Sequence, residues 1–263
     1  MTQQSSHKAR KRFGQNFLQD HNVIYSILSN IQANSGEHWV EIGPGLGAIT
    51  EPLIEKGVSL DVVELDRDLV KILEQRFGSN DNFSIHSADA LKFDFSALAK
   101  DNSSLRIIGN LPYNISTPLL FHLLDSAYCI EDMHFMLQKE VVERMASQPG
   151  TSAYGRLGIM TQYYCKVQPL FLVDPSAFKP APKVESAIVR LVPHKVLPYP
   201  VESVERLQNV VRIAFTKRRK TLRNALSGIV APEALEDLNI EASLRPENLS
   251  LEQYCLLSNW KPE

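Results

Sequence analysis

Residues 40–50 read VEIGPGLGAIT, a short apolar segment that runs into three closely spaced glycines. Glycine adopts backbone conformations that other residues avoid, so Gly43, Gly45 and Gly47 predict a tight turn directly after a strand. The residues that follow suit a helix, and the N–H groups at its start would point at anything bound near the turn. The stretch predicts a strand–turn–helix unit with a small-ligand site, and a simple tight turn is the alternative.

Strand and helix patterns alternate on the C-terminal side of this unit. Strands are predicted within 38–43, 59–66, 82–91, 105–114 and 132–138, and helices within 48–57, 67–77, 119–127 and 139–147. Ser116-Thr117-Pro118 predicts a cap and a first-turn proline for the third of these helices. Strands separated by helices indicate a parallel, Rossmann-like α/β sheet that is covered on both faces.

The pattern changes after residue 147. A loop at 147–155 and a helix lead to two further predicted strands, 167–173 and 185–192, joined by the proline-rich segment 174–184. A connection without a helix fits an antiparallel hairpin at the end of the sheet. Residues 193–202 suggest a linker, and the rest of the chain shows only helical patterns. We predict a basic N-terminal, cofactor-contacting segment over 1–35, an α/β catalytic domain over 36–193 and a small all-α domain over 201–263.

The composition is that of an ordinary soluble globular protein, with 44% hydrophobic and 22% charged residues in 263. No apolar stretch is long enough to span a bilayer, and the N-terminus lacks the apolar core of a signal peptide. We therefore expect a cytoplasmic protein that does not associate with membranes. The distant cysteines Cys129, Cys165 and Cys255 indicate ordinary thiols and neither a disulfide framework nor a metal site.

The net charge of -2 conceals two basic segments. The first carries +4 and the second +5, which leaves -11 for the remaining residues. Two basic segments on an acidic body suit a polyanionic partner, and a frayed tail plus one solvated helix face is the alternative. The residues concerned are Lys8, Arg10, Lys11 and Arg12, and Lys217, Arg218, Arg219, Lys220 and Arg223.

Acidic residues follow the second and third predicted strands. Glu64 is placed to accept hydrogen bonds from both hydroxyls of a ribose, and Asp89 to accept one from an adenine amino group. The carboxyl ends of neighbouring parallel strands meet at one edge of a sheet, so both residues converge on the glycine turn. The ligand is then a nicotinamide dinucleotide or S-adenosylmethionine. The G-x-G-x-G spacing lacks the pyrophosphate pattern G-x-G-x-x-G and favours S-adenosylmethionine.

The fourth predicted strand ends in Asn110-Leu111-Pro112-Tyr113, which faces the same crevice. The side-chain oxygen of Asn110 and the carbonyl of Leu111 can accept both hydrogens of an exocyclic amine on a base. That arrangement favours a pyramidal nitrogen whose lone pair points at a methyl donor. Pro112 fixes the chain, and Tyr113 offers a flat face for the base. An isolated tetrapeptide of this kind would be an ordinary turn with a tyrosine in the core.

These motifs together resemble the ribosomal RNA adenine N6,N6-dimethyltransferases, most closely the bacterial small-subunit members whose loss gives kasugamycin resistance. The matching segments are RKRFGQNFL, VEIGPGLGAIT, VELDRDL, ADAL, GNLPYNISTPLLFHLL, HFMLQKEVVERM and FKPAPKVESAIVRL, and FTKRRKTLRNAL continues the likeness toward the C-terminus.

The resemblance assigns roles to residues that the patterns alone do not single out. It implies that Asn16 and Leu18 contact the cofactor together with Gly43, Glu64 and Asp89. It assigns the same role to Asn110, and the glycine turn itself adds Gly45 to the predicted cofactor contacts. It also implies that Phe178 closes over the second face of the target adenine, although its sequence context by itself predicts a core residue.

The resemblance further implies a substrate, namely two adjacent adenosines in the 3′-terminal hairpin loop of 16S ribosomal RNA in the small subunit. Loop bases are already unstacked, which lowers the cost of presenting them. The basic segments then become phosphate contacts, with residues 217–223 on an RNA-facing helix. We expect a monomer that needs no metal and takes part in small-subunit biogenesis. The alternatives are a large-subunit methyltransferase of the macrolide-resistance type and a non-catalytic assembly factor on the same fold.

Overall fold

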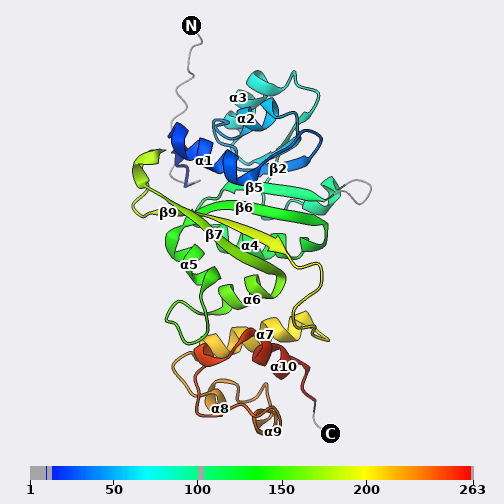
Figure 1. Cartoon of the computed structure of the whole chain (residues 1–263), viewed down its shortest axis with the longest axis vertical. Coiled ribbons are helices and arrows are strands. Elements are labelled where there is room, and N and C mark those ends of the chain that lie inside the picture. The colour runs from blue at the N-terminus through cyan, green and yellow to red at the C-terminus, as the bar shows by residue number, and fades with distance from the viewer. Residues whose placement is uncertain (1–9, 11–13, 100–103, 262–263) are drawn as a thin grey trace. The chain divides into compact units, whose positions relative to one another are not determined.

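The computed structural model describes residue 10 and residues 14–99 and 104–261 of the chain (Figure 1). Backbone contacts divide it into two compact units. The first contains residues up to Val142 together with Gln168–Pro193, and the second contains Glu143–Val167 and the chain from His194 onward. Residues 143–167 thus group with the helical C-terminal part, whereas the predicted division placed them within 36–193. That division into functional domains stays a prediction.

A seven-stranded sheet forms the centre of the first unit, with strand order β4-β3-β2-β5-β6-β9-β7. The strands are β2 (His38–Ile42), β3 (Ser59–Glu64), β4 (Phe83–Ser87), β5 (Leu105–Asn110), β6 (Ile130–Gln138), β7 (Cys165–Val173) and β9 (Ser186–Pro193). The pairs from β4 to β6 are parallel, and β9 runs antiparallel to β6. The predicted Rossmann-like sheet that ends in the β7–β9 hairpin is therefore confirmed.

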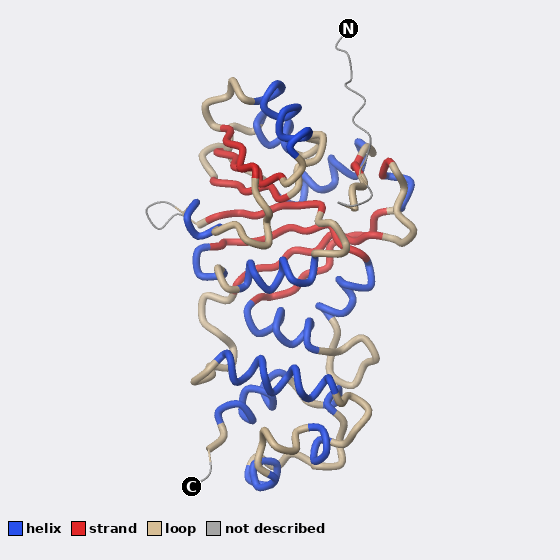
Figure 2. The backbone as a smooth tube through the Cα atoms, turned by 180° about the vertical axis from the view of Figure 1, so that it is seen from behind, coloured by secondary structure: helices blue, strands red, loops and turns tan. Residues whose placement is uncertain are grey.

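Helices cover both faces of this sheet. Helices α1 (His21–Ile31), α2 (Thr50–Glu55) and α3 (Arg67–Phe77) contribute buried residues to one hydrophobic cluster, which also contains Trp39 of β2 and Leu60 of β3. Helix α4 (Ser116–Leu124) covers the opposite face, the one seen in Figure 2. Asp20 and Asp66 cap α1 and α3 by accepting hydrogen bonds from N–H groups of the first turn.

The predicted cap of α4 is wrong. Ile115 occupies the cap position without a side-chain hydrogen bond, and Ser116 is already the first helical residue. The Ser116 hydroxyl donates instead to the Tyr113 carbonyl at 3.1 Å. The serine therefore stabilises the loop before the helix. Pro118 still lies in the first turn, where a missing N–H leaves no intrahelical bond unmade.

A second, two-stranded sheet joins the N-terminal segment to the proline-rich connection. Strand β1 (Phe17–Leu18) pairs antiparallel with β8 (Phe178–Lys179), so that Leu18 lies opposite Phe178. The Gln19 N–H extends this contact by donating to the Ala177 carbonyl at 2.8 Å. No periodicity in the sequence indicates this pairing, because each strand has only two residues.

The second unit is helical, as predicted for the C-terminal part of the chain. It contains α6 (Arg156–Tyr164), α7 (Val204–Thr216), α8 (Leu222–Ala225), α9 (Pro232–Asp237) and α10 (Leu251–Asn259), and α5 (Lys139–Ala146) crosses into it from the first unit. It also contains a short 3-10 turn at Pro246–Asn248. The first unit contains three such turns, at Phe95–Leu98, Ala127–Cys129 and Pro175–Ala177. Among the described residues, no helix is long and apolar enough to cross a membrane.

The position of the second basic segment corrects the prediction of an RNA-facing helix. Helix α7 ends at Thr216, and residues 217–220 form the turn that leads to α8. At Lys217 the backbone has already left the helical region, with φ -112° and ψ 35°. The cations are therefore presented by a loop and by the first turn of a short helix.

Candidate active site

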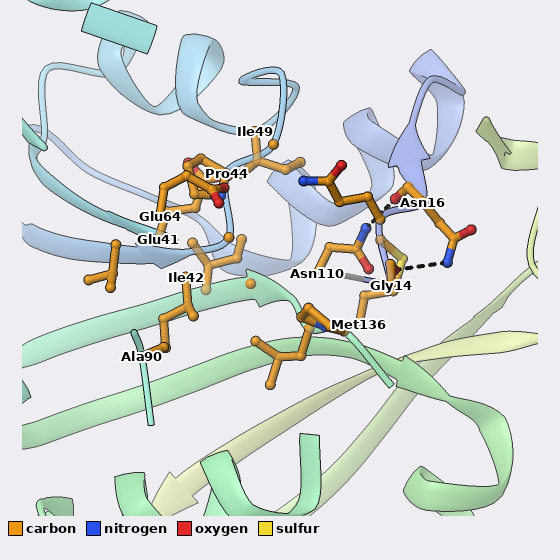
Figure 3. A pocket seen from close by; sticks show the side chains of 18 of the residues that line it. Gly14, Asn16, Glu41, Ile42, Pro44, Ile49, Glu64, Ala90, Asn110 and Met136 are labelled. Carbon is orange, nitrogen blue, oxygen red and sulfur yellow. Dashed lines mark hydrogen bonds between the residues drawn. The ribbon is translucent and has the colours of Figure 1, made fainter. Parts of the chain in front are cut away.

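The carboxyl ends of β2, β3 and β5 border a cavity of about 380 Å³ (Figure 3). The sheet order reverses between β2 and β5, and such a switch point opens a crevice above the strand ends. Every residue predicted for the cofactor or for the chemistry lines this cavity, except Phe178. The lining includes Asn16, Leu18, Gly43, Gly45, Glu64, Asp89, Asn110, Leu111, Pro112 and Tyr113.

The glycine turn takes the conformation that its sequence predicts. Gly43 and Gly45 have φ values of 68° and 59°, in the left-handed region that strains most L residues. A Cβ atom at Gly45 would also lie only 3.0 Å from the ring of Phe17. The turn therefore depends on glycine both for its backbone conformation and for the close approach of the N-terminal segment.

Glu64 and Asp89 lie at neighbouring strand ends with different environments. Glu64 is buried, and its carboxylate accepts hydrogen bonds from the Asp66 N–H at 2.8 Å and from the Gly45 N–H. Burial raises its pKa above the ordinary value. One oxygen of Asp89 accepts the Leu91 N–H at 3.0 Å. Both carboxylates are thus fixed by backbone groups, and both line the cavity.

The orientation of the Asn110 side chain is decided by one long-range hydrogen bond. Its amide nitrogen donates to the Asn16 carbonyl at 3.0 Å, across 94 positions of sequence. The amide oxygen is left as the acceptor for a ligand. The next residue is held as well, because the Leu111 N–H donates to the Met136 carbonyl of β6 at 3.2 Å. Figure 3 shows Asn110 turned toward Asn16 at one side of the cavity, with Glu41 and Glu64 at the other.

Tyr113 is tethered at both ends. Its hydroxyl lies 2.7 Å from the Ser186 hydroxyl of β9, and its carbonyl accepts the Ser116 hydroxyl. The side chain is partly buried, and burial raises the pKa of its hydroxyl. The phenol is therefore neutral at physiological pH, and its ring has a defined place in the cavity wall.

Comparisons with known proteins decide the family. The sequence profile described as "Ribosomal RNA adenine dimethylase" matches residues 6–263. The chain belongs to this family. Proteins named "Ribosomal RNA small subunit methyltransferase A" from Pseudomonas putida and Marinobacter nauticus are 58% and 59% identical to it over 259 residues. In both cases the alignment covers 98% of this chain, and it covers 97% and 94% of those proteins respectively.

Two solved structures of similar fold cover 92% of the chain. A dimethyladenosine transferase from Plasmodium falciparum matches with a TM-score of 0.80 and 26% identity over 95% of its own chain. The 23S rRNA methyltransferase ErmE matches with a TM-score of 0.70 and 25% identity over 98% of its own chain. The resemblance inferred from the motifs is confirmed, and the chain is an adenine dimethylase of the ribosomal RNA type.

The N-terminal segment of this dimethylase is clamped beside the cavity by contacts that sequence reasoning missed. Asp66, at the start of α3, accepts hydrogen bonds from Arg10 at 2.8 Å and from Gln15 at 3.0 Å. Arg10 also pairs with Asp68. Arg10, predicted as a phosphate contact, is thus engaged within the protein, while Lys8, Lys11 and Arg12 lie outside the described residues. The clamp holds the segment that supplies the Asn16 carbonyl.

Glu41 is a second residue that sequence reasoning missed. It lines the cavity next to the glycine turn, is buried, and accepts the Thr50 hydroxyl at 2.6 Å. Burial raises its pKa to about 7, and the charge of Glu64 adds to that rise. The sequence contains one indication of this residue, namely an acidic side chain inside a largely apolar strand.

His134 is a further residue of the cavity wall that the sequence motifs do not single out. It lies on β6 and lines the cavity, with a buried side chain. Neither ring nitrogen has a hydrogen-bond partner among the described residues, and the nearest carboxylate oxygen, on Asp132, is 3.8 Å away. Burial lowers the pKa of His134 to about 4, so the ring is neutral at physiological pH.

Phe178, unlike the other predicted site residues, does not line the cavity. It is 5% exposed, belongs to the hydrophobic cluster of the first unit and pairs with Leu18 through β8 and β1. Its position therefore agrees with the core residue that its context predicts. A stacking role would require the side chain to leave this cluster, and that role stays a prediction.

A hollow in the second unit is lined by four of the five cations of the second basic segment. It is lined by Thr216, Lys217, Arg218, Arg219, Lys220 and Asn224. Arg218 is held within the unit, since it pairs with Glu247 at 2.6 Å and donates to the Ser152 carbonyl at 2.7 Å. Lys217, Arg219 and Lys220 are exposed. The hollow thus presents a concentrated positive charge.

Proposed function

We propose that this dimethylase transfers methyl groups from S-adenosylmethionine to the N6 amines of two adjacent adenosines in the 3′-terminal hairpin loop of 16S ribosomal RNA. The orientation of Asn110 is the observation that carries the proposal. Because its amide nitrogen is engaged by the Asn16 carbonyl, only its oxygen can face a substrate amine. An exocyclic amine of adenine offers the N–H groups that such an acceptor requires.

The cofactor residues proposed here fit a nucleoside with an amino-acid tail. Glu64 would accept the ribose hydroxyls, Asp89 the adenine amine, and the backbone of Gly43 and Gly45 would lie against the tail. S-adenosylmethionine supplies an electrophilic methyl group when bound. Asn16 and Leu18, on the clamped N-terminal segment, would cover the tail and exclude water from it. The cavity is lined largely by apolar side chains with these polar groups at its edges, which suits such a ligand.

Catalysis in this proposal is positioning with electrostatic help. The Asn110 oxygen and the Leu111 carbonyl accept both N–H groups of the amine, which reduces delocalisation of the nitrogen lone pair into the ring. Pro112 sets the path of the chain, and the Tyr113 ring supports the base by stacking. Holding the reactants in line removes much of the entropic barrier. The methylated amine then releases its proton to solvent, so that no strong base is needed.

The choice of the small ribosomal subunit as substrate is supported by the relatives at 58% and 59% identity, which are named for it. The 23S enzyme that resembles the chain is only 25% identical. The basic hollow of the second unit supplies charge for phosphate contacts. We infer a cytoplasmic, monomeric enzyme that acts during small-subunit biogenesis.

The direct test incubates the protein and labelled S-adenosylmethionine with small or large subunits from a strain that lacks the modification. Mass spectrometry should find dimethyladenosine at two neighbouring positions of the 16S 3′ hairpin. Methylation of large subunits alone would overturn the choice of substrate and favour the macrolide-resistance type of activity.

A variant distinguishes catalysis from a purely structural role in assembly. Asn110→Ala should lower turnover by about 100-fold, the usual loss for one positioned electrostatic contact, while subunit binding stays unchanged. Asn30→Ala, which removes an exposed amide on α1, is the matched control. Equal turnover of the two variants would contradict the role given to Asn110, and a wild-type protein that binds subunits without methylating them would be an assembly factor.

A further inference from the structure

Ser186 is a fully buried serine that is not among the predicted site residues. It contacts one of them, Tyr113. It is the first residue of β9 and lies opposite Gln138 of β6, with 0% of its surface exposed. Its hydroxyl lies 2.7 Å from that of Tyr113, across 73 positions of sequence. The central sheet therefore contacts, through Ser186, the side chain of Tyr113, on which the target base would stack.

This contact fixes the far end of the Tyr113 ring. The hydroxyl is the atom most distant from the backbone, so a bond there restrains both side-chain torsions. The near end is fixed separately, because the Ser116 hydroxyl donates to the Tyr113 carbonyl. Without the Ser186 hydroxyl, the backbone of Tyr113 would stay fixed, and the orientation of its ring would lose this restraint.

We propose that Ser186 is a positioning residue that holds the Tyr113 ring for catalysis, and that the second methyl transfer depends on it more than the first. The proposal rests on the proposed function, in which Tyr113 stacks on the adenine. It assigns Ser186 no contact with the substrate or with the reacting atoms.

The difference between the two transfers follows from counting N–H groups. Unmodified adenine has two, which the Asn110 oxygen and the Leu111 carbonyl can both accept. Once the amine carries one methyl group, a single N–H remains, and one of these restraints is lost. A net hydrogen bond is worth about 1 kcal/mol, or roughly a fivefold change in a rate constant. Stacking on the Tyr113 ring then supplies a larger share of the restraint on the base.

Substitutions at both ends of the contact test this proposal. Ser186→Ala and Tyr113→Phe each remove the hydroxyl contact while keeping the ring. Single-turnover reactions on unmodified small subunits, analysed by mass spectrometry, give separate rate constants for monomethyl- and dimethyladenosine formation. We expect each variant to slow the second step about fivefold more than the first, so that monomethyladenosine accumulates. The double variant should be no slower than the slower single variant, because both changes break the same contact.

Two controls separate positioning from general damage. Cofactor affinity, measured by calorimetry, should stay within twofold of the wild type in both variants. Ser258→Ala removes another buried serine hydroxyl, one that donates to the Cys255 carbonyl in the second unit, and should leave the product ratio unchanged. If Ser186→Ala fails to fold, Tyr113→Phe still tests the contact, because it removes the other hydroxyl and the Tyr113 side chain is only partly buried.

Three outcomes would overturn the proposal: equal slowing of both steps, additive losses in the double variant, or a shifted product ratio in Ser258→Ala. These differ from failure of the proposed function, in which the wild-type protein itself would form no dimethyladenosine on small subunits.

Discussion

Glu41→Gln tests whether a carboxyl group beneath the glycine turn changes its charge within the physiological range. The side chain is buried, and its pKa rises from 4.5 to about 7. Gln keeps an oxygen that can accept the Thr50 hydroxyl, so the substitution removes the ionisable group with little change in shape. The only large effect expected is on the pH dependence of stability.

A rise of the Glu41 pKa from 4.5 to about 7 corresponds to about 3 kcal/mol of unfolding free energy. A group whose pKa is raised by folding contributes stability below its unfolded pKa and loses that contribution as the pH rises through its folded pKa. The wild-type protein should therefore lose about 3 kcal/mol of unfolding free energy between pH 4.5 and pH 8 from Glu41. Glu41→Gln should not show this loss, although other groups still titrate in both proteins.

Tryptophan fluorescence provides a local assay. The two tryptophans of the chain lie in different compact units, Trp39 in the first and Trp260 in the second. In a Trp260→Phe background, urea unfolding followed through Trp39 reports on the unit that contains Glu41. Glu55→Gln, which removes an exposed carboxylate from α2, is the matched control. Equal losses of unfolding free energy in Glu41→Gln and Glu55→Gln between pH 5 and pH 8 would contradict the assignment of this titration to Glu41.

Three further predictions concern other charged groups. Folding lowers the His134 pKa from 6.5 to about 4, so the stability of the wild-type protein falls as the pH drops through this range. His134→Leu should therefore lose about 2 kcal/mol less unfolding free energy than the wild type between pH 7 and pH 4.5, as measured by urea unfolding. Arg106→Met should lower the unfolding free energy by about 3 kcal/mol at pH 7, because it removes a bidentate partner of the buried Asp132. Arg190 still contacts that carboxylate in the variant. Thermal unfolding would contradict this expectation if Arg76→Met, which breaks the more exposed ion pair with Glu51, lost as much stability. The double variant Arg219→Ala, Lys220→Ala should bind a loop RNA with a weaker dependence on salt. If each side chain neutralises one phosphate, the slope of the logarithm of the binding constant against the logarithm of the salt concentration should fall in magnitude by about 1.4. An unchanged slope in filter binding would show that neither side chain contacts the RNA.

The helices and strands of the first unit, and the sheet edge that carries the candidate site, could be predicted from local sequence patterns. Alternating apolar runs predicted the parallel strands, and the glycine turn, Glu64 and Asp89 predicted a crevice at their carboxyl ends. These features are local: a strand or a turn depends on residues within a few positions of one another. Parallel topology then brings the ends of successive strands together, so convergence could be predicted without knowing any side-chain contact.

The hydrogen bonds that orient the side chains of the candidate site could not be predicted from the sequence. The side-chain nitrogen of Asn110 donates to the Asn16 carbonyl, and the hydroxyl of Tyr113 contacts that of Ser186. The same holds for Arg10, which sequence charge marks as a phosphate contact and which the fold directs to Asp66. Such contacts join residues far apart in the chain, and they form only when strand register and loop geometry bring two particular polar atoms within about 3 Å. Composition and periodicity carry no information on that distance, so the sequence could predict which residues form the candidate site but not which of their polar atoms are hydrogen-bonded within the protein.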